Sequence, residues 1–130
     1  MGNSLNELID KPKFKAAIKY FNSAKWYIAH DLFEEMWHQS DEPERSFLQG
    51  LLQVSVAQFH LENGNLNGAT ILYGEGLGRL KSFKKSEVDI DMIKLCDFLK
   101  DRLSLLQSGN SIDHSISPYI YELDAGLELS

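Results

Sequence analysis

The chain has 130 residues, the usual size of one domain with its own hydrophobic core, and 43% of them are hydrophobic. With that composition and a formal net charge of only −6, the chain does not belong to the intrinsically disordered class. The negative charge gives little attraction to nucleic acids or anionic membranes, so we expect neither as a partner. Only 13 residues are Val, Ile or Thr, the types that suit strands, so helices are expected.

Two features of the sequence indicate the cellular compartment. Cys96 is the only cysteine, so no internal disulfide can form, which fits a reducing compartment. No apolar run approaches the length of a membrane span, and the first residues, MGNSLNELIDKPKF, lack the apolar segment of a secretion signal. We therefore expect a soluble, cytoplasmic protein.

Apolar residues recur at helical spacing through most of the chain. Pro12 favours a helix start, Gly64 favours a helix end, and Asn65 and Ser86 are good N-cap residues. Acidic residues that follow Ser86 favour the helix dipole there. These signals predict five helices, over residues 12–21, 25–39, 44 or 45–63, 65–83 and 86–107.

Links of a few residues force neighbouring helices to pack nearly antiparallel. The predicted fold is therefore all-α, a single helical bundle of about five helices that forms one domain over residues 1–130. Residues 111–130 are less regular, and their apolar side chains predict a C-terminal tail packed on the bundle. These apolar tail residues are Ile116, Tyr119, Ile120, Tyr121 and Leu123.

Gly74, Gly76 and Gly78 follow an apolar stretch, as glycines do in a phosphate-binding loop. The dinucleotide-binding pattern needs a further glycine where Arg79 stands, and no strand and helix pattern surrounds the segment. We interpret the three glycines as small residues that allow close packing of helices.

The second predicted helix carries the first candidate site, in the sequence WYIAHDLFEEMWH. At about 100° per residue, His30 and Glu34 are neighbours one turn apart, and Trp37 falls within roughly 60° of His30. They lie between an apolar arc and a charged arc that includes Asp31. A carboxylate beside an imidazole can set its tautomer, raise its basicity or share a metal with it. The alternative is an ordinary surface pair at i,i+4 spacing.

The third predicted helix is apolar nearly all round, which is typical of a central, buried helix. The members of its one polar stripe are Arg45, Gln49, Gln53 and His60. Buried amides and guanidinium groups need partners, and the His30/Glu34 edge of the preceding helix is the obvious one. We therefore expect all six side chains to converge in one pocket between the two helices. The alternative is an amphipathic helix whose polar stripe faces solvent.

Such a pocket could hold a metal ion. His30 and Glu34 supply two ligands and His60 supplies a third, and an open zinc site of the catalytic type takes three protein ligands plus water. Zinc or a similar divalent ion fits the hardness of these ligands. The sequence leaves the presence of the metal open, and it indicates no other cofactor.

Several phrases of the sequence occur together in a known family. The phrases are His-x-x-x-Glu-x-x-Trp at His30, Glu34 and Trp37, then Arg45-Ser-Phe-Leu-Gln-Gly-Leu-Leu-Gln53, the turn Gly64-Asn65, and Gly68-Ala69. In these phrases the segment 21–80 resembles the small bacterial, archaeal and plastid-lineage proteins that are grouped as domain of unknown function 309.

This resemblance implies an all-helical fold and a suggested metal site at His30 and Glu34. The sequence differs from the family at two positions. Asp31 stands where the family usually has Glu, so its carboxylate has a shorter reach. Ala24 stands where Gly is common.

Two classes of function remain. In the first, the protein is a non-catalytic binding or assembly module, and the polar cluster is a buried network. In the second, it is a small metal-associated enzyme for hydrolytic or proton-transfer chemistry on a small anionic ligand. His30 is then the base or a metal ligand, Glu34 orients it, and Arg45 supplies the countercharge. No complete catalytic set is present, so we prefer the first class; a homo-oligomer fits either. The candidate pocket residues around His30 and Glu34 are Asp31, Trp37, Arg45, Gln49 and Gln53.

Overall fold

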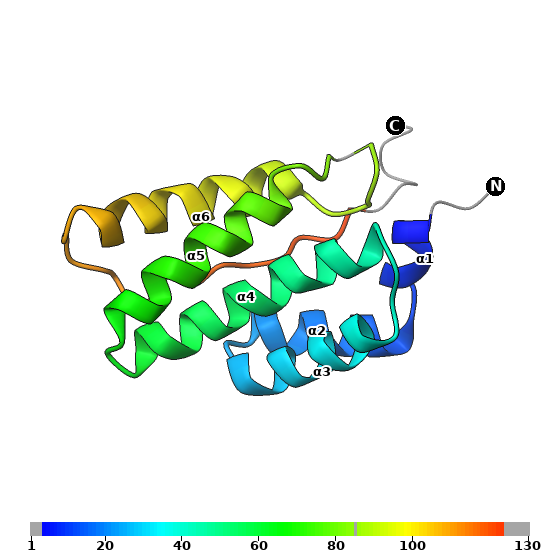
Figure 1. Cartoon of the computed structure of the whole chain (residues 1–130), viewed down its shortest axis with the longest axis horizontal. Helices are drawn as coiled ribbons and strands as arrows, with labels where there is room; N and C mark the ends of the chain where they lie inside the picture. The colour runs from blue at the N-terminus through cyan, green and yellow to red at the C-terminus, as the bar shows by residue number, and fades with distance from the viewer. Residues whose placement is uncertain (1–3, 85, 124–130) are drawn as a thin grey trace.

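The computed structural model describes residues 4–84 and 86–123. These residues form an all-α helical bundle, which confirms the predicted fold class (Figure 1). In chain order the helices are α1 (Ser4–Ile9), α2 (Pro12–Asn22), α3 (Trp26–His38), α4 (Glu44–Glu62), α5 (Leu66–Leu80) and α6 (Met92–Gln107). None of the helices in this part of the chain is both long and apolar enough to cross a membrane.

The first three predicted helices match α2, α3 and α4 to within one residue at each end. Pro12 is the first residue of α2, as its fixed backbone angle favours. The short helix α1 is an addition to the prediction, because it is too short to show a periodic pattern in the sequence. It is held to the bundle by its apolar side chains, and the buried ones are Leu5, Leu8 and Ile9.

The last helix begins later than the sequence predicts. The N-cap of α6 is Asp91, whose side chain accepts a hydrogen bond from a backbone amide in the first turn at 3.0 Å. Ser86 lies in the preceding link, where Ile90 is buried and pairs with Glu122 as an isolated antiparallel bridge. The prediction of a helix from Ser86 was wrong. Residues of this link are buried against the tail, and the link is therefore not helical.

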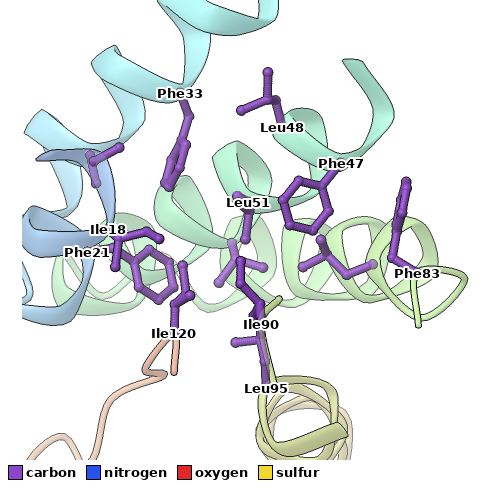
Figure 2. Close-up of a cluster of buried hydrophobic side chains, with 14 of the residues drawn as sticks. Ile18, Phe21, Phe33, Phe47, Leu48, Leu51, Phe83, Ile90, Leu95 and Ile120 are labelled. Carbon is purple, nitrogen blue, oxygen red and sulfur yellow. The ribbon is translucent and has the colours of Figure 1, made fainter. Parts of the chain in front are cut away.

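Helix α4 is the central element of the bundle. It packs against α3 on one flank and α5 on the other, and its buried residues cover most of its circumference. Figure 2 shows side chains from several elements gathered around it, among them Phe33 from α3, Leu95 from α6 and Ile120 from the tail. The predicted central helix is confirmed. The apolar residues that α4 buries are Phe47, Leu48, Leu51, Val54, Ala57 and Leu61.

The contact between α4 and α5 depends on two glycines. A Cβ atom added at Gly76 would lie 2.8 Å from Val54 Cγ2 and 3.1 Å from the carbonyl oxygen of Gly50. One added at Gly50 would lie 2.7 Å from Leu80 Cγ. Close packing of the two helices therefore explains why residue 76 is a glycine, as predicted. It does not explain its neighbours Gly74 and Gly78, since an added Cβ would meet nothing within 4 Å at either.

The turn between α2 and α3 places Ala24 in a left-handed conformation, with φ at +59°. In this conformation the Cβ atom crowds the following carbonyl oxygen, which costs about 1–2 kcal/mol for any residue but glycine. The backbone of this turn therefore favours glycine at position 24.

The predicted packing of the tail on the bundle is confirmed for the described residues 111–123, which return along the bundle (Figure 1). Asn22 Nδ2 donates to the Ile120 carbonyl at 2.9 Å, and the Ile120 amide donates to Asn22 Oδ1 at 2.8 Å. The Ile120 side chain is buried, and Leu123 is partly buried. The exposed apolar residues of the tail are Ile116, Tyr119 and Tyr121. The rest of the predicted tail, residues 124–130, lies outside the described residues.

A buried polar network fixes the start of the tail to α4, α5 and α6. Arg102 is only 4% exposed, and its guanidinium donates to Gln58 Oε1 at 3.2 Å, to the Ile116 carbonyl at 2.8 Å and to the Asp113 carbonyl at 3.4 Å. The hydroxyl of Tyr73, which is fully buried, donates to the same oxygen of Gln58. Because a buried charge is stable only where its donors are satisfied, these oxygens determine where the tail leaves α6.

No motif in the sequence indicates a role for Gln58, Tyr73 or Arg102. The burial of Arg102 could have been predicted, because at about 100° per residue it falls on the same stripe of α6 as Leu95 and Leu99. An arginine on the apolar stripe of a helix indicates a buried, satisfied charge. The identity of its partners depends on which helices meet α6, and the stripe alone does not tell that.

Replacement of Gly76 by Ala should destabilise the protein by about 1–3 kcal/mol, because the added Cβ forces α4 and α5 apart. Gly78→Ala is the matched control, since its Cβ meets no atom and the better helix propensity of Ala should stabilise by about 0.5–1 kcal/mol. Urea unfolding followed by circular dichroism measures both. Equal midpoints for the two variants would contradict the close approach of the helices.

Burial raises the pKa of the Tyr73 hydroxyl far above its ordinary value. The folded state therefore holds this proton more tightly than the unfolded chain, in which a tyrosine titrates near about pH 10. The stability that Tyr73 contributes is fully present below that pH and falls by about 1.4 kcal/mol per pH unit above it. Tyr73→Phe should be less stable at neutral pH by about 0.5–1.5 kcal/mol and should lose stability less steeply in alkali. Parallel alkaline slopes in urea unfolding would contradict this.

Candidate functional site

The His30 side chain lies in a short polar network on α3. His30 Nε2 is 3.0 Å from Glu34 Oε2, and His30 Nδ1 is 3.2 Å from Asp31 Oδ1. His38, one turn beyond Glu34, places its Nε2 atom 3.7 Å from Glu34 Oε1. The neighbourhood of His30 and Glu34 that the helical spacing predicts is therefore present, and Asp31 joins it. Both nitrogens of His30 face carboxylates of their own helix.

Arg45, at the start of α4, turns towards the end of α3. Its guanidinium carbon lies 3.8 Å from the centre of a Trp37 ring, and its Nη1 atom donates to the carbonyls of Trp37 at 3.1 Å and Ser40 at 3.5 Å. These carbonyls belong to the last turn of α3 and the residues after it, where intrahelical donors are missing. Among the residues that the structure describes, no ion pair joins Arg45 to Glu34, although the predicted pocket places them together.

Trp37 is less deeply buried than Trp26, which is almost fully enclosed. The Trp26 indole nitrogen donates to Glu62 Oε1 at 2.9 Å, and its ring meets Phe21 edge to face at 4.9 Å between centroids. The Trp37 indole nitrogen is buried and has no hydrogen-bond partner among the described residues. Of the two tryptophans of α3, Trp26 is therefore part of the buried core and Trp37 lies at its edge.

Gln53 is buried and points to α5, away from the candidate site on α3. Its Nε2 atom donates to Glu75 Oε2 at 2.9 Å, while its Oε1 atom is buried without a hydrogen-bond partner in the described part of the chain. Gln49, one turn earlier, is partly buried. Because α4 is enclosed on several sides, its polar stripe is divided between neighbours. The sequence alone does not indicate Glu75 as the partner.

His60 lies near the end of α4, and His30 lies near the start of α3. Both line a cavity of about 200 Å³ between the two helices. The His60 Nδ1 atom is 3.2 Å from Asn65 Nδ2, at the start of α5. His60 and His30 thus share the lining of one cavity. The other residues that line this cavity are Trp26, Tyr27, Ser55, Val56 and Phe59.

Exposed apolar side chains surround the mouth of this cavity. Tyr27 is 64% exposed and Phe59 is 40% exposed, and their ring centroids lie 6.0 Å apart. Ile28 is also exposed, and a second cavity of about 260 Å³ adjoins the first, since Trp26, Tyr27 and Phe59 line both. We call Tyr27, Ile28 and Phe59 the aromatic patch. The aromatic patch could not be predicted from the sequence, because Tyr27 and Phe59 meet only in the particular register of α3 on α4.

The predicted pocket of six side chains is therefore divided into separate groups. His30 and Glu34 form one group with Asp31, His30 and His60 share the apolar cavity, Arg45 stacks on Trp37, and Gln53 contacts Glu75. The expected meeting of Glu34 with Arg45 does not occur in the described residues.

Of the three predicted metal ligands, only His30 and Glu34 lie together. His30 Nε2 and Glu34 Oε2 lie close enough to serve one ion, but His60 contacts Asn65 instead of joining them. In the described part of the chain, no three His, Cys, Asp or Glu side chains are arranged to hold a metal ion. The residues thus supply two neighbouring ligands and do not fit a zinc site that needs three.

Arg45→Met should lower the stability by about 1–2 kcal/mol, because the carbonyls of Trp37 and Ser40 lose a charged donor and the Trp37 ring loses its stacked cation. Arg79→Met is the matched control, since the Arg79 side chain forms no hydrogen bond or ion pair within the described residues, and its effect should stay within about 0.5 kcal/mol. Thermal unfolding compares the two. Equal losses would show that Arg45 does not stabilise the end of α3.

The sequence matches the family described as Domain of unknown function (DUF309) over residues 14–72. The matched segment runs from α2 through α3 and α4 into α5, and it contains His30, Glu34, Trp37 and the polar stripe of α4. The comparison with curated proteins gives no match. The predicted resemblance is confirmed: residues 14–72 of this chain are similar to the DUF309 family.

Proposed function

We propose that this protein is a binding module, and that its site is the aromatic patch with the adjoining His30 and Glu34. The observation that carries the proposal is that His30, the first residue of the His-x-x-x-Glu-x-x-Trp pattern, lines an apolar cavity at the patch. A cavity of about 200 Å³ is smaller than the pockets of drug-sized ligands, which measure about 300–1,000 Å³. It suits one apolar side chain of a partner.

The partner that we propose is a protein segment with an apolar side chain next to a lysine or arginine. Exposed carboxylates flank the cavity on the side of His30, since the side chains of Asp31 and Glu34 are 59% and 46% exposed. A basic residue beside the apolar anchor would meet these charges. The net charge of −6 also favours a basic protein segment over a nucleic acid or an anionic membrane. The single cysteine supports the cytoplasm as the place of this interaction.

The arrangement of His30 favours binding over catalysis. Each ring nitrogen lies within hydrogen-bond distance of a carboxylate on the same helix. While these contacts hold, both nitrogens are directed at carboxylates of α3 and not at a group bound in the cavity. Arg45, which the enzymatic alternative uses as a countercharge for a small anion, is stacked on Trp37 instead.

The metal-associated alternative has one observation in its favour, the 3.0 Å separation of His30 Nε2 and Glu34 Oε2. It predicts that purified protein carries a stoichiometric divalent metal, which is lost in His30→Ala. The binding module predicts no such change. Elemental analysis of both proteins separates the two functions.

The binding proposal can be tested with small probes that reproduce the anchor. Isopentylammonium carries a branched apolar chain and a cation, isopentanol lacks the charge, and isovalerate reverses it. Saturable shifts of the Val56 methyl resonances are expected with isopentylammonium, weaker ones with isopentanol and the weakest with isovalerate. Val56→Phe should abolish the shifts of neighbouring resonances by filling the cavity, whereas Ile71→Phe, at an exposed position of α5, should not.

A pair of variants tests whether the site prefers a cationic ligand. Glu34→Gln should weaken isopentylammonium binding by about two- to fivefold, as expected for one partly exposed ion pair, and leave isopentanol binding unchanged. Glu35→Gln, on the same helix, should change neither, because Glu35 pairs with Lys13 at 2.9 Å. Equal binding of the three probes would contradict a basic partner. A dimer in sedimentation that Val56→Phe abolishes would instead identify the occupant as a second copy of this chain.

A further inference from the structure

A larger cavity lies at the other side of the bundle, where the chain passes from α5 to α6. It measures about 580 Å³, within the usual range of about 300–1,000 Å³ for small-molecule sites. In Figure 1 this link lies at the end of the bundle where the ribbon changes from green to yellow. Phe83 from the link and Met92 from the first turn of α6 line the cavity, and both are buried. The cavity shares no lining residue with the two at the aromatic patch.

The rim of this cavity is basic although the whole chain is acidic. Lys81, Lys84 and Lys100 line it, against a single carboxylate from Asp97. None of these three lysines forms an ion pair within the described residues. Three cations without partners around one hollow attract an anion, and the attraction is strongest at low ionic strength.

The walls of the cavity are apolar. Phe83 and Met92 form its buried part, and Ile93 is 68% exposed at its edge. Cys96 lies between them and is partly buried; burial is the main cause that raises the pKa of its thiol, and nearby Lys100 acts in the opposite direction. The thiol is thus shielded by its surroundings while it borders the cavity. A ligand that fits this site carries both a negative head and an apolar body.

We propose that the α5–α6 cavity binds a small amphiphile with an anionic head, such as a carboxylate or phosphate, and an apolar tail. The head lies among Lys81, Lys84 and Lys100, and the tail lies against Phe83, Met92 and Ile93. This assignment does not depend on the proposed function of the aromatic patch. It also gives the small anionic ligand that the sequence suggests a different place in the fold, away from Arg45.

Cys96 reports directly on the occupancy of the cavity. Octanoate should protect it from alkylation by iodoacetamide at constant alkaline pH, and the protection should saturate. Octanol and octylammonium, which have the same chain without the negative charge, should protect much less, and acetate should not protect at all. Shifts of the Met92 and Ile93 methyl resonances provide a second measurement that needs no reaction of the thiol.

The role of the lysines is tested by a triple variant, Lys81→Gln, Lys84→Gln and Lys100→Gln. It should bind octanoate about tenfold more weakly, the combined effect expected of three exposed charges. The control is Lys11→Gln, Lys19→Gln and Lys25→Gln, which removes the same charge elsewhere and should bind as the original protein does. Circular dichroism melting shows whether each variant remains folded.

Three outcomes would overturn the proposal. The first is a lack of saturable protection and of methyl shifts with octanoate. The second is equal protection by octanoate and octylammonium, and the third is equal affinity of the two triple variants. Octyl phosphate in place of octanoate shows which anionic head is preferred. Binding to phosphatidylglycerol vesicles that depends on the three lysines, without octanoate binding, would assign them to a membrane surface instead.

Discussion

The close approach of α4 and α5 at Gly50 and Gly76 is the constraint on which the rest of the structure depends. Because neither residue has a Cβ, the two helices pack at a separation that a Cβ at Gly76 would prevent. This contact, with α3 on the opposite flank, encloses α4 and determines what each of its side chains meets. The polar stripe of α4 is divided as a result. Gln53 contacts α5, His60 borders the cavity shared with α3, and Arg45 reaches the end of α3.

The buried guanidinium of Arg102 has a similar role for the other half of the bundle. It binds Gln58 of α4 and two carbonyls of the tail, so that one charge joins α6, α4 and the returning chain. The tail in turn pairs with the link before α6 through Ile90 and Glu122. Because of this packing the link is not helical, and it borders the α5–α6 cavity. The two proposed sites therefore differ in charge as well as in position. Carboxylates flank the aromatic patch, whereas lysines surround the α5–α6 cavity.

Much of the fold could be predicted from the sequence, because helical periodicity is a local property. The ends of α2, α3 and α4 follow from Pro12, from short polar links and from Gly64, whose φ of +77° is the left-handed conformation expected at a helix end. The start of α6 could not be predicted in this way. Ser86 and Asp91 are both good N-caps, and the choice between them depends on burial of Ile90 against the tail. Such a contact, between residues far apart in the chain, leaves no periodic pattern.

The candidate site shows the same division. The sequence by itself determined the contact of His30 with Glu34, since residues four apart on a helix are neighbours whatever surrounds them. It also determined that α4 would be buried, because that helix is apolar on nearly every side. Only the tertiary structure decided that Arg45 stacks on Trp37, that Gln53 binds Glu75, and that Tyr27 meets Phe59 beside the His30 cavity. The physical reason is that each of these contacts joins different helices, and its partners are set by the angle and register at which packed surfaces interlock.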